Sequence, residues 1–391
     1  MWTNTVVVGL VGLLVIWLGN WIRRWRNPKC NGILPPGSMG FPLIGETLSL
    51  IIPSYSLDLH PFFKTRIQRY GTIFRTNIAA RPAIISVDPE FNNFLLREEG
   101  RLVELWYLDT FSKIFTLEGE SQVNAVGAVH KYLRRTVLNH FGIVSLREKL
   151  LPQLEQVVNK ALSSWSAQDS VEIKQVASSL SLEFGAKQIF SYDAESSPTS
   201  ITEALSRILN GLLSFPLNIP GTAYHQSLKA EQEAILKNRQ NPNSSLTWDE
   251  YKSMTFTHNV INESLRMGNT APGLLRRAIK DIPVKEFTIP AGWTIMMVTS
   301  AQHFSPNTFH NPLEFNPRRW KELDSTVTSN NFTPFGGGGR QCAGAEYSRV
   351  FMATFFHVLL TKYRWTKIRG NIFRNPILGF GKGVYIKFYK K

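Results

Sequence analysis

The stretch Phe335-Gly336-Gly337-Gly338-Gly339-Arg340-Gln341-Cys342-Ala343-Gly344 is the most informative part of this chain. It places a lone cysteine behind a run of glycines and just before a helical segment, 344–363. The first turn of a helix has unpaired N–H groups and a partial positive charge, which favour a charged sulfur. Glycines let the backbone pass close to a flat ligand, Phe335 can exclude water, and Arg340 can pair with an anionic group. We therefore expect Cys342 to present a thiolate to a metal.

Two other interpretations of this stretch explain it less well. A phosphate-binding loop would end in Gly-Lys-Ser/Thr, which is absent here. A buried structural cysteine in a glycine-rich turn would not require phenylalanine, arginine and the final glycine at these offsets. Cys30 and Cys342 are the only cysteines of the chain, too few for a disulfide framework and without the paired spacing of a zinc site. We expect Cys30 to have no role as a ligand.

Composition and charge narrow the class of protein. The 391 residues suffice for a large core, and 43% hydrophobic with 19% charged residues is ordinary globular composition. A net charge of +15 favours an acidic partner, which could be nucleic acid, an anionic membrane face or an acidic protein. The basic residues are spread along the chain without zinc-finger or helix-turn-helix spacing, which argues against nucleic acid.

The N-terminal segment 1–22 carries no charged side chain and is almost wholly apolar from Val6 to Leu18. A helix that crosses the hydrocarbon core needs about 20 residues, so the length just suffices. Tryptophans lie near both ends, and three arginines follow at once: Arg23, Arg24 and Arg26. A cleaved signal peptide would have a basic residue before the apolar run and a small-residue cleavage site after it, and neither is present. We predict an uncleaved single-pass anchor with the body on the cytosolic face.

The rest of the chain is expected to form a basic, Pro/Gly-rich hinge (23–46) and one body (47–391). Periodicity and turn residues predict a mainly α protein of the α+β type. The individual expectations are a strand pair over 75–87 turning at 79–82, helices over 145–165 and 247–267, short strands over 282–299 around Pro290, and a final helix over 344–363. Thr247 and Glu250 have the spacing of a capping box.

The stretch ending at Gly344 resembles the haem-binding loop of the cytochrome P-450 family, the haem-thiolate monooxygenases, and matches all its fixed positions. The resemblance implies that family's fold with a small β region. It also implies haem b as cofactor, with Cys342 ligating the iron and Phe335, Gly338, Arg340 and Gly344 forming the cradle.

Other segments resemble family motifs in the family's order. Glu263-Ser264-Leu265-Arg266 is similar to the Glu-x-x-Arg helix motif, whose ends share a helix face. Phe315-Asn316-Pro317-Arg318-Arg319-Trp320 is similar to the Pro-x-Arg segment. The implied role of Glu263, Arg266 and Arg319 is a structural triad that holds the loop before Cys342.

Three basic residues are implied to contact the haem propionates. His130-Lys131-Tyr132-Leu133-Arg134-Arg135 resembles the family's propionate-binding helix, with His130 at its usual tryptophan position and Arg134 at its arginine. Pro272-Gly273-Leu274-Leu275-Arg276 resembles the strand that supplies another arginine, although Arg277 is adjacent and either could point inward. Without the cysteine loop, a solvated basic face would be the better interpretation of the helix.

The segment 214–222 looks like the roof of the substrate pocket in the plant branch that oxidises sterols, triterpenoids and terpenoid hormones. That branch implies an apolar substrate, a membrane NADPH-dependent reductase as electron donor, and the endoplasmic reticulum membrane as location.

One part of the family's pattern is missing. The helix across the distal face of the haem carries Ala/Gly-Gly-x-Asp/Glu-Thr, yet no Gly-x-Asp/Glu-Thr occurs between Gly185 and Glu263. The only Gly-Glu-Thr of the chain, Gly45-Glu46-Thr47, lies in the hinge and is not this motif. We therefore expect an internal deletion near 230–231 and identify no catalytic residue on the distal side. Three functions remain open: an active monooxygenase, an impaired or inactive family member, and a membrane-anchored basic binding protein without haem.

Overall fold

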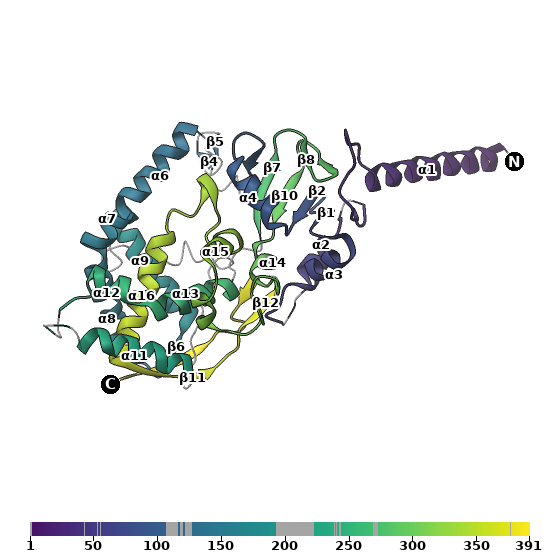
Figure 1. Cartoon of the computed structure of the whole chain (residues 1–391). Helices are drawn as coiled ribbons and strands as arrows, with labels where there is room; N and C mark the ends of the chain where they lie inside the picture. Colours follow the sequence, from purple (N-terminus) through teal and green to yellow (C-terminus); the bar gives the residue numbers. More distant parts are fainter. Residues whose placement is uncertain are drawn as a thin grey trace. The chain divides into compact units, whose positions relative to one another are not determined.

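A computed structural model describes residues 2–42, 44–52, 54, 56–106, 116–117, 120–121, 127–192, 223–237, 239, 241, 244–268, 273–375 and 377–391. The chain divides into two compact units, both visible in Figure 1. The first comprises Met1–Ile52, His60–Asn124 and Gly273–Val298, and the second comprises Pro53–Leu59, Ala125–Pro272 and Thr299–Lys391.

The first unit is built on a five-stranded sheet in the order β1-β2-β10-β7-β3. Strands β2 and β10 run parallel, and the other neighbours run antiparallel. Its elements are α1 (Trp2–Arg26), α2 (Thr47–Ile51), α3 (Pro61–Tyr70), β1 (Ile73–Ile78), β2 (Arg81–Ser86), α4 (Pro89–Arg97), β3 (Val103–Leu105), β4 (Thr116–Leu117), β5 (Glu120–Ser121), β7 (Leu274–Ala278), β8 (Ile282–Val284), β9 (Phe287–Ile289) and β10 (Thr294–Met297).

The predicted strand pair and the predicted short strands are confirmed, as β1–β2 and as β8, β9 and β10. The hairpin turn is tighter than expected, because it uses only Ala79 and Ala80, with φ of 52° and 63°. A two-residue hairpin turn of this type needs positive φ at both positions. Pro82 already belongs to β2, but it precedes Ala83, where pairing with β10 begins, so its missing N–H removes no bond on that side.

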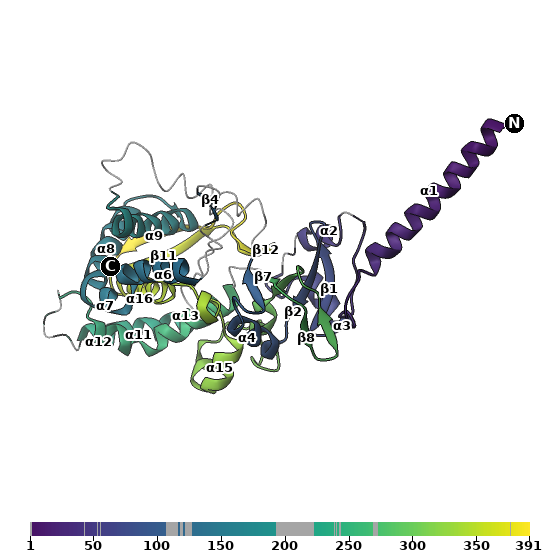
Figure 2. The same cartoon turned by 90° about the horizontal axis from the view of Figure 1, so that it is seen from above.

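The Pro/Gly-rich segment lies along β1. The Arg75 amide donates to the Pro36 carbonyl at 2.8 Å, and an ideal Cβ on Gly37 would stand 2.0 Å from the Arg75 oxygen, so only glycine fits. Trp25, near the end of α1, packs against the apolar core of the sheet. Figure 2 shows the rest of α1 running clear of that sheet. Among the side chains that the structure describes, which in α1 begin at Leu10, no helix is long and apolar enough to span a membrane.

The second unit is mainly helical, as expected, with small sheets β11-β14-β6 and β12-β13. Its elements are α6 (Gly127–Phe141), α7 (Ile143–Ser145), η2 (Leu146–Leu150), α8 (Leu151–Ser166), β6 (Val171–Glu172), α9 (Ile173–Phe190), α11 (Ala223–Lys237), α12 (Trp248–Ser253), α13 (Thr255–Gly268), α14 (Thr299–His303), η3 (Pro317–Lys321), α15 (Ser325–Asn331), η4 (Gly338–Arg340), α16 (Ala345–Lys362), β11 (Tyr363–Arg369), β12 (Phe373–Asn375), β13 (Ile377–Gly379) and β14 (Tyr385–Lys390).

Helix α16 is the centre of this unit. Every residue from 350 to 360 is buried, and α8, α11 and α13 pack against it (Figure 1). A helix that is apolar on all sides is stable only when it is surrounded in this way. The start of α16, where the cysteine loop joins it, is therefore supported by the most deeply buried helix of the unit.

The helix predicted over 247–267 is in fact two helices, α12 and α13, separated at Met254. The capping box is confirmed, since Thr247 Oγ1 accepts from the Glu250 amide at 3.2 Å and the Thr247 amide donates to Glu250 at 2.8 Å. The second helix has its own cap from a distant element. The Glu231 carboxylate on α11 accepts from the amides of Phe256 and Thr257, at 2.5 and 2.8 Å.

The buried His357 of α16 links α11 to the region around α12. Its Nδ1 lies 2.7 Å from Gln232 Oε1, and its Nε2 lies 3.4 Å from the guanidinium of Arg239. Because a guanidinium can only donate, Nε2 accepts and the imidazole is neutral. Burial, reinforced by the charge of Arg239, lowers the pKa of His357 to about 4.

The depressed pKa of His357 predicts a loss of stability in acid. The unfolded chain, with a histidine pKa of 6.5, binds a proton before the folded chain does. The free energy of unfolding should therefore fall as pH drops below 6.5, by about 1.4 kcal/mol per pH unit, until the folded value near 4 is reached. Urea unfolding between pH 7 and pH 5 measures this slope. In a His357→Gln variant, the slope of the unfolding free energy against pH should correspond to about one proton fewer taken up on unfolding. An unchanged slope would contradict the assignment.

Candidate functional site

Cys342 lies at the N-terminal end of α16 and its side chain is exposed. Its amide donates to the Phe335 carbonyl at 2.9 Å, which closes the loop, and Gly344 is the residue that precedes the helix. Gly336 and Gly338 have φ of 71° and 64°. Residues other than glycine rarely adopt positive φ, so the loop depends on glycine at both positions.

The glycine loop presents a face without side chains. Gly338 and Gly339 are exposed, and an ideal Cβ built on Gly339 would meet nothing within 4 Å. A Cβ on Gly344 would lie 3.9 Å from the Cys342 sulfur. A flat ligand can therefore approach the sulfur and the loop backbone closely.

Helix α6 contacts this loop through Arg134. Its Nη1 donates to the Gln341 carbonyl, next to the cysteine, at 2.5 Å. His130 lies one turn earlier on the same helix, on the same side as Arg134. A row of exposed apolar residues runs beside them at i, i+4, i+8, namely Val129, Leu133 and Val137, which are 51%, 39% and 37% exposed. Apolar side chains at helical spacing normally face a partner. The part of the site formed by α6 and the loop therefore suits a large apolar ligand with anionic groups.

The structure brings Glu263, Arg266 and Arg319 together in a buried ion cluster. Arg266 donates to both Glu263 oxygens, at 2.9 and 2.8 Å, and Arg319 donates to one of them at 3.1 Å. The side chains of Glu263 and Arg266 are fully buried. Both arginines also donate to backbone carbonyls from the last residue of α14 to the chain just before η3: His303, His310, Asn311, Pro312 and Glu314. The cluster thus fixes the chain that leads towards the cysteine loop.

Two supporting side chains, those of Trp320 and Arg349, were assigned no role from the sequence. Trp320 donates its indole N–H to Glu263 at 3.0 Å, which completes the carboxylate's shell together with the Asn316 amide at 2.8 Å. Arg349 on α16 lies 5.5 Å from the centre of the Phe335 ring, and it donates to Asn262 of α13 at 2.5 Å. Trp320 directly follows Arg319 and could have been noticed. Arg349 belongs to no spacing pattern.

Arg276 and Arg277 lie in the first unit, on β7, and point to opposite sides. Arg276 is buried and pairs with Glu99 at 2.5 Å, whereas Arg277 is half-exposed and pairs with Glu104 at 2.6 Å. Arg276 is therefore the inward residue of the two. Its guanidinium is already paired with the Glu99 carboxylate, so a haem propionate would have to compete with Glu99 for it. The contact between Arg276 and a propionate stays a prediction.

The hinge motif Gly45-Glu46-Thr47 has a structural role of its own. The Glu46 carboxylate pairs with Arg66 at 2.7 Å and accepts from Thr76 at 2.6 Å. Because both contacts lie within the first unit, the Glu46 carboxylate stabilises the fold of that unit. The roof segment 214–222 lies outside the described residues, which resume at α11.

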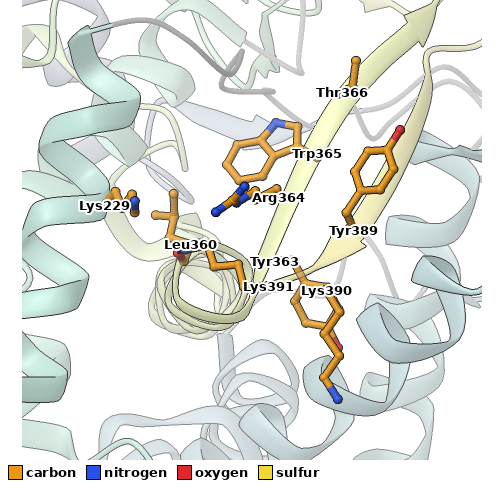
Figure 3. A pocket seen from close by; sticks show the side chains of 9 residues that line it. All are labelled: Lys229, Leu360, Tyr363, Arg364, Trp365, Thr366, Tyr389, Lys390 and Lys391. Carbon is orange, nitrogen blue, oxygen red and sulfur yellow. Dashed lines mark hydrogen bonds between the residues drawn. The ribbon is translucent and has the colours of Figure 1, made fainter.

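A separate hollow of about 670 Å³ lies in the second unit at the other end of α16. Figure 3 shows Lys229 of α11 and Arg364 of β11 pointing toward one another across it. Since α16 spans 18 residues, this hollow is about 27 Å from the cysteine end of the helix. It is not part of the cysteine site.

Comparisons with known proteins agree on one family. The family model "Cytochrome P-450" matches residues 223–381. The chain is 42% identical to beta-amyrin 16-alpha-hydroxylase of Maesa lanceolata, over 98% of this chain and 99% of that protein. It is 43% identical to cucurbitadienol 11-hydroxylase of Siraitia grosvenorii, over the full length of both. The solved structure of retinoic acid-bound cyanobacterial CYP120A1 shares the fold, with a TM-score of 0.72, 22% identity and coverage of 93% of this chain and all of that one.

A lone cysteine behind a glycine loop, at the start of a buried helix, defines a class of proteins that present a thiolate to a metal cofactor. The comparisons give the class its name: this chain belongs to the cytochrome P-450 family of monooxygenases, which are oxidoreductases with a haem-thiolate cofactor. The residues on the cysteine side fit such a cofactor, since they offer a sulfur donor, an open glycine face, an apolar row and two basic groups. The alignment with the Siraitia protein has 475 positions, more than the 391 residues of this chain. That relative therefore has residues inside the matched range that this chain lacks.

Proposed function

We propose that this chain binds haem b through Cys342 and oxidises an apolar triterpenoid or sterol with electrons from a membrane NADPH-dependent reductase. The observation that carries the proposal is the exposed sulfur at the start of the buried α16, beside an open glycine face. The substrate class rests on the two hydroxylases that are 42% and 43% identical over nearly their whole length, one named for beta-amyrin and one for cucurbitadienol.

The side chains around the sulfur have distinct roles in this proposal. Bound haem supplies the activation of oxygen, which a thiolate ligand favours by donating electron density to the iron. Arg134 holds the Gln341 carbonyl and so fixes the backbone next to the ligand, while Arg340 supplies positive charge and His130 a ring N–H donor for the propionates. Phe335 shields the sulfur from water, and Gly338 and Gly344 leave room for the porphyrin.

A second candidate is a family member that holds haem but turns over slowly or not at all. The aligned relatives are longer inside the matched range, and the distal Gly-x-Asp/Glu-Thr motif is absent. We place the deletion near 230–231. Both residues lie inside the uninterrupted helix α11, which is consistent with two helices joined in phase. Without the distal helix, water would reach the reacting face and proton delivery would lack its acid and alcohol.

One experiment separates these candidates. The full chain is expressed in membranes, and the reduced carbon monoxide difference spectrum reports thiolate-ligated haem. The same membranes then receive reductase, NADPH and either beta-amyrin or cucurbitadienol, and products are identified by mass spectrometry. The shifted band with product supports the monooxygenase, and the band without product supports the impaired member. A well-folded protein without the band contradicts both.

A chimera tests the deletion itself. The segment that the Siraitia hydroxylase has and this chain lacks is inserted between Ala230 and Glu231. If the missing helix limits activity, product formation per bound haem should rise by about 100-fold or more, the order of magnitude expected when general acid–base catalysis and water exclusion are restored. An equal rate in the chimera and the parent would show that the helix is not the limiting element.

We also propose that α1 anchors the chain in the endoplasmic reticulum membrane with the body in the cytosol. The apolar residues of α1 from Leu10 to Leu18 are exposed, and arginines follow them. Deleting residues 2–26 should move most of the protein from the membrane pellet to the soluble fraction, since a single apolar helix of about 20 residues accounts for the affinity. Carbonate extraction and sedimentation measure this. Retention of the deletion variant after extraction would contradict the proposal.

A further inference from the structure

His303, the last residue of α14, is a buried histidine outside the triad and the cysteine loop. Its Nε2 lies 3.1 Å from the amide of Thr333, two residues before Phe335. Since an amide can only donate, Nε2 accepts and the ring proton is on Nδ1. The Thr333 carbonyl in turn accepts from the Gly336 amide at 3.1 Å. The hydrogen bond to one imidazole nitrogen therefore fixes the backbone segment from which the cysteine loop starts.

The position of His303 is itself fixed from two sides. Arg266 of the triad donates to the His303 carbonyl at 2.8 Å, and the Phe332 ring lies 5.4 Å from the imidazole. Trp320, which donates to Glu263, packs on Phe332 with ring centres 4.5 Å apart. His303 thus connects the buried ion cluster to Thr333 through one side-chain hydrogen bond.

The second nitrogen of His303 is unfavourable for stability. Within the described part of the chain, buried Nδ1 has no hydrogen-bond partner. Leaving a buried donor unpaired is destabilising, and a leucine or phenylalanine of similar size would avoid the loss. A histidine at this position therefore needs another reason, and the bond from the Thr333 amide provides one.

We propose that His303 is a positioning residue for Cys342: it sets the start of the cysteine loop by accepting the Thr333 amide. This inference rests on the proposed role of Cys342 as the haem ligand, and it adds a residue that touches neither the sulfur nor the porphyrin. The imidazole does this only when neutral. Burial, reinforced by the charge of Arg266, lowers the pKa of His303 to about 3, so the acceptor persists throughout the physiological range.

Amide hydrogen exchange on the full chain tests the proposal without relying on activity. In His303→Leu, the amides of Thr333, Gly336 and Cys342 should exchange about tenfold faster than in the parent, because the bond that orders them is lost. Reference amides in α16, residues 350–360, should exchange at the parental rate. His303→Gln retains an acceptor oxygen at similar reach and should restore the loop rates to within about threefold of the parent. His303→Phe, which fills the volume without an acceptor, replaces the leucine variant if that one does not fold.

Two outcomes would overturn the proposal: loop rates unchanged in the leucine or phenylalanine variant, or loop and α16 rates raised by the same factor. The second would mean that His303 acts only on global stability. Where haem is bound, the variants are also compared by the share of the carbon monoxide complex that gives the thiolate-type band at equal haem content. That share should fall in the variants without an acceptor and recover in His303→Gln. If the parent itself never binds haem, the proposed function fails, while the exchange rates still decide the role of His303.

Discussion

Cys342→Ala is expected to abolish the shifted band of the reduced carbon monoxide complex and to remove all oxidation of triterpenoid substrate. Alanine offers the iron no electron pair, so any haem that remains is held by another ligand or by none. The fold should be unaffected, because the Cys342 side chain is exposed and its truncation removes no buried contact. A change in stability of less than about 0.5 kcal/mol is the ordinary result at such a position.

The matched control for this variant is Cys30→Ser. Cys30 is the other cysteine of the chain, half-buried, with its sulfur 3.5 Å from the Thr288 carbonyl in the first unit. Serine keeps the donor, so the spectrum and the melting temperature should match the parent. Difference spectra at equal protein concentration and thermal unfolding of all three proteins provide the comparison. A thiolate-type band that survives in Cys342→Ala would refute the assignment of the ligand.

Glu263→Gln is expected to have the largest effect on stability. The carboxylate accepts from Arg266, Arg319, Trp320 and the Asn316 amide, and its side chain is fully buried. A neutral amide would leave two guanidinium groups without a counter-charge in a site that excludes water. Removing one partner of a buried ion pair destabilises by about 3–5 kcal/mol. Because a domain of this kind is stable by only about 5–15 kcal/mol, we expect a large fall in folded yield and in the urea midpoint.

Two further variants make this measurement decisive. Asp249→Asn removes an ion pair with the same i, i+3 spacing, but Asp249 and Lys252 are 87% and 58% exposed, so solvent screens the pair and the change in stability should be much smaller than for Glu263→Gln. Trp320→Phe removes one hydrogen bond to Glu263 and should destabilise by about 1–2 kcal/mol, which keeps the effect measurable if Glu263→Gln does not fold. Equal stability of Glu263→Gln and Asp249→Asn would show that the cluster contributes little.

The features that could be predicted from the sequence are those set by neighbours along the chain. The β1–β2 hairpin, the capping box of Thr247 and Glu250, and the helix after Cys342 each depend on residues within a few positions of one another. Backbone hydrogen bonds, glycine conformations and caps act over that same range. The cysteine loop was informative for this reason, because its glycines, arginine and sulfur occupy one short stretch.

Contacts between distant segments could not be predicted in the same way. The break at Met254 exists because Glu231, on another helix, caps α13. Alternation along β7 implies that Arg276 and Arg277 face opposite sides, but only the tertiary structure, which buries Arg276 against the partly buried Glu99, decides which of them is inward.

The sequence by itself determined the class of protein, the sulfur at position 342 and the helix that begins behind it, since all three follow from local chemistry. The tertiary structure decided what supports that sulfur: Arg134 on the Gln341 carbonyl, Trp320 on Glu263 and His303 on the Thr333 amide. The sequence placed Arg134 on the propionate-binding helix and Trp320 beside Arg319, but the role of each of the three residues depends on which distant group lies within about 3 Å of it. That proximity results from the packing around α16, and packing between distant segments does not follow from residues that are neighbours along the chain.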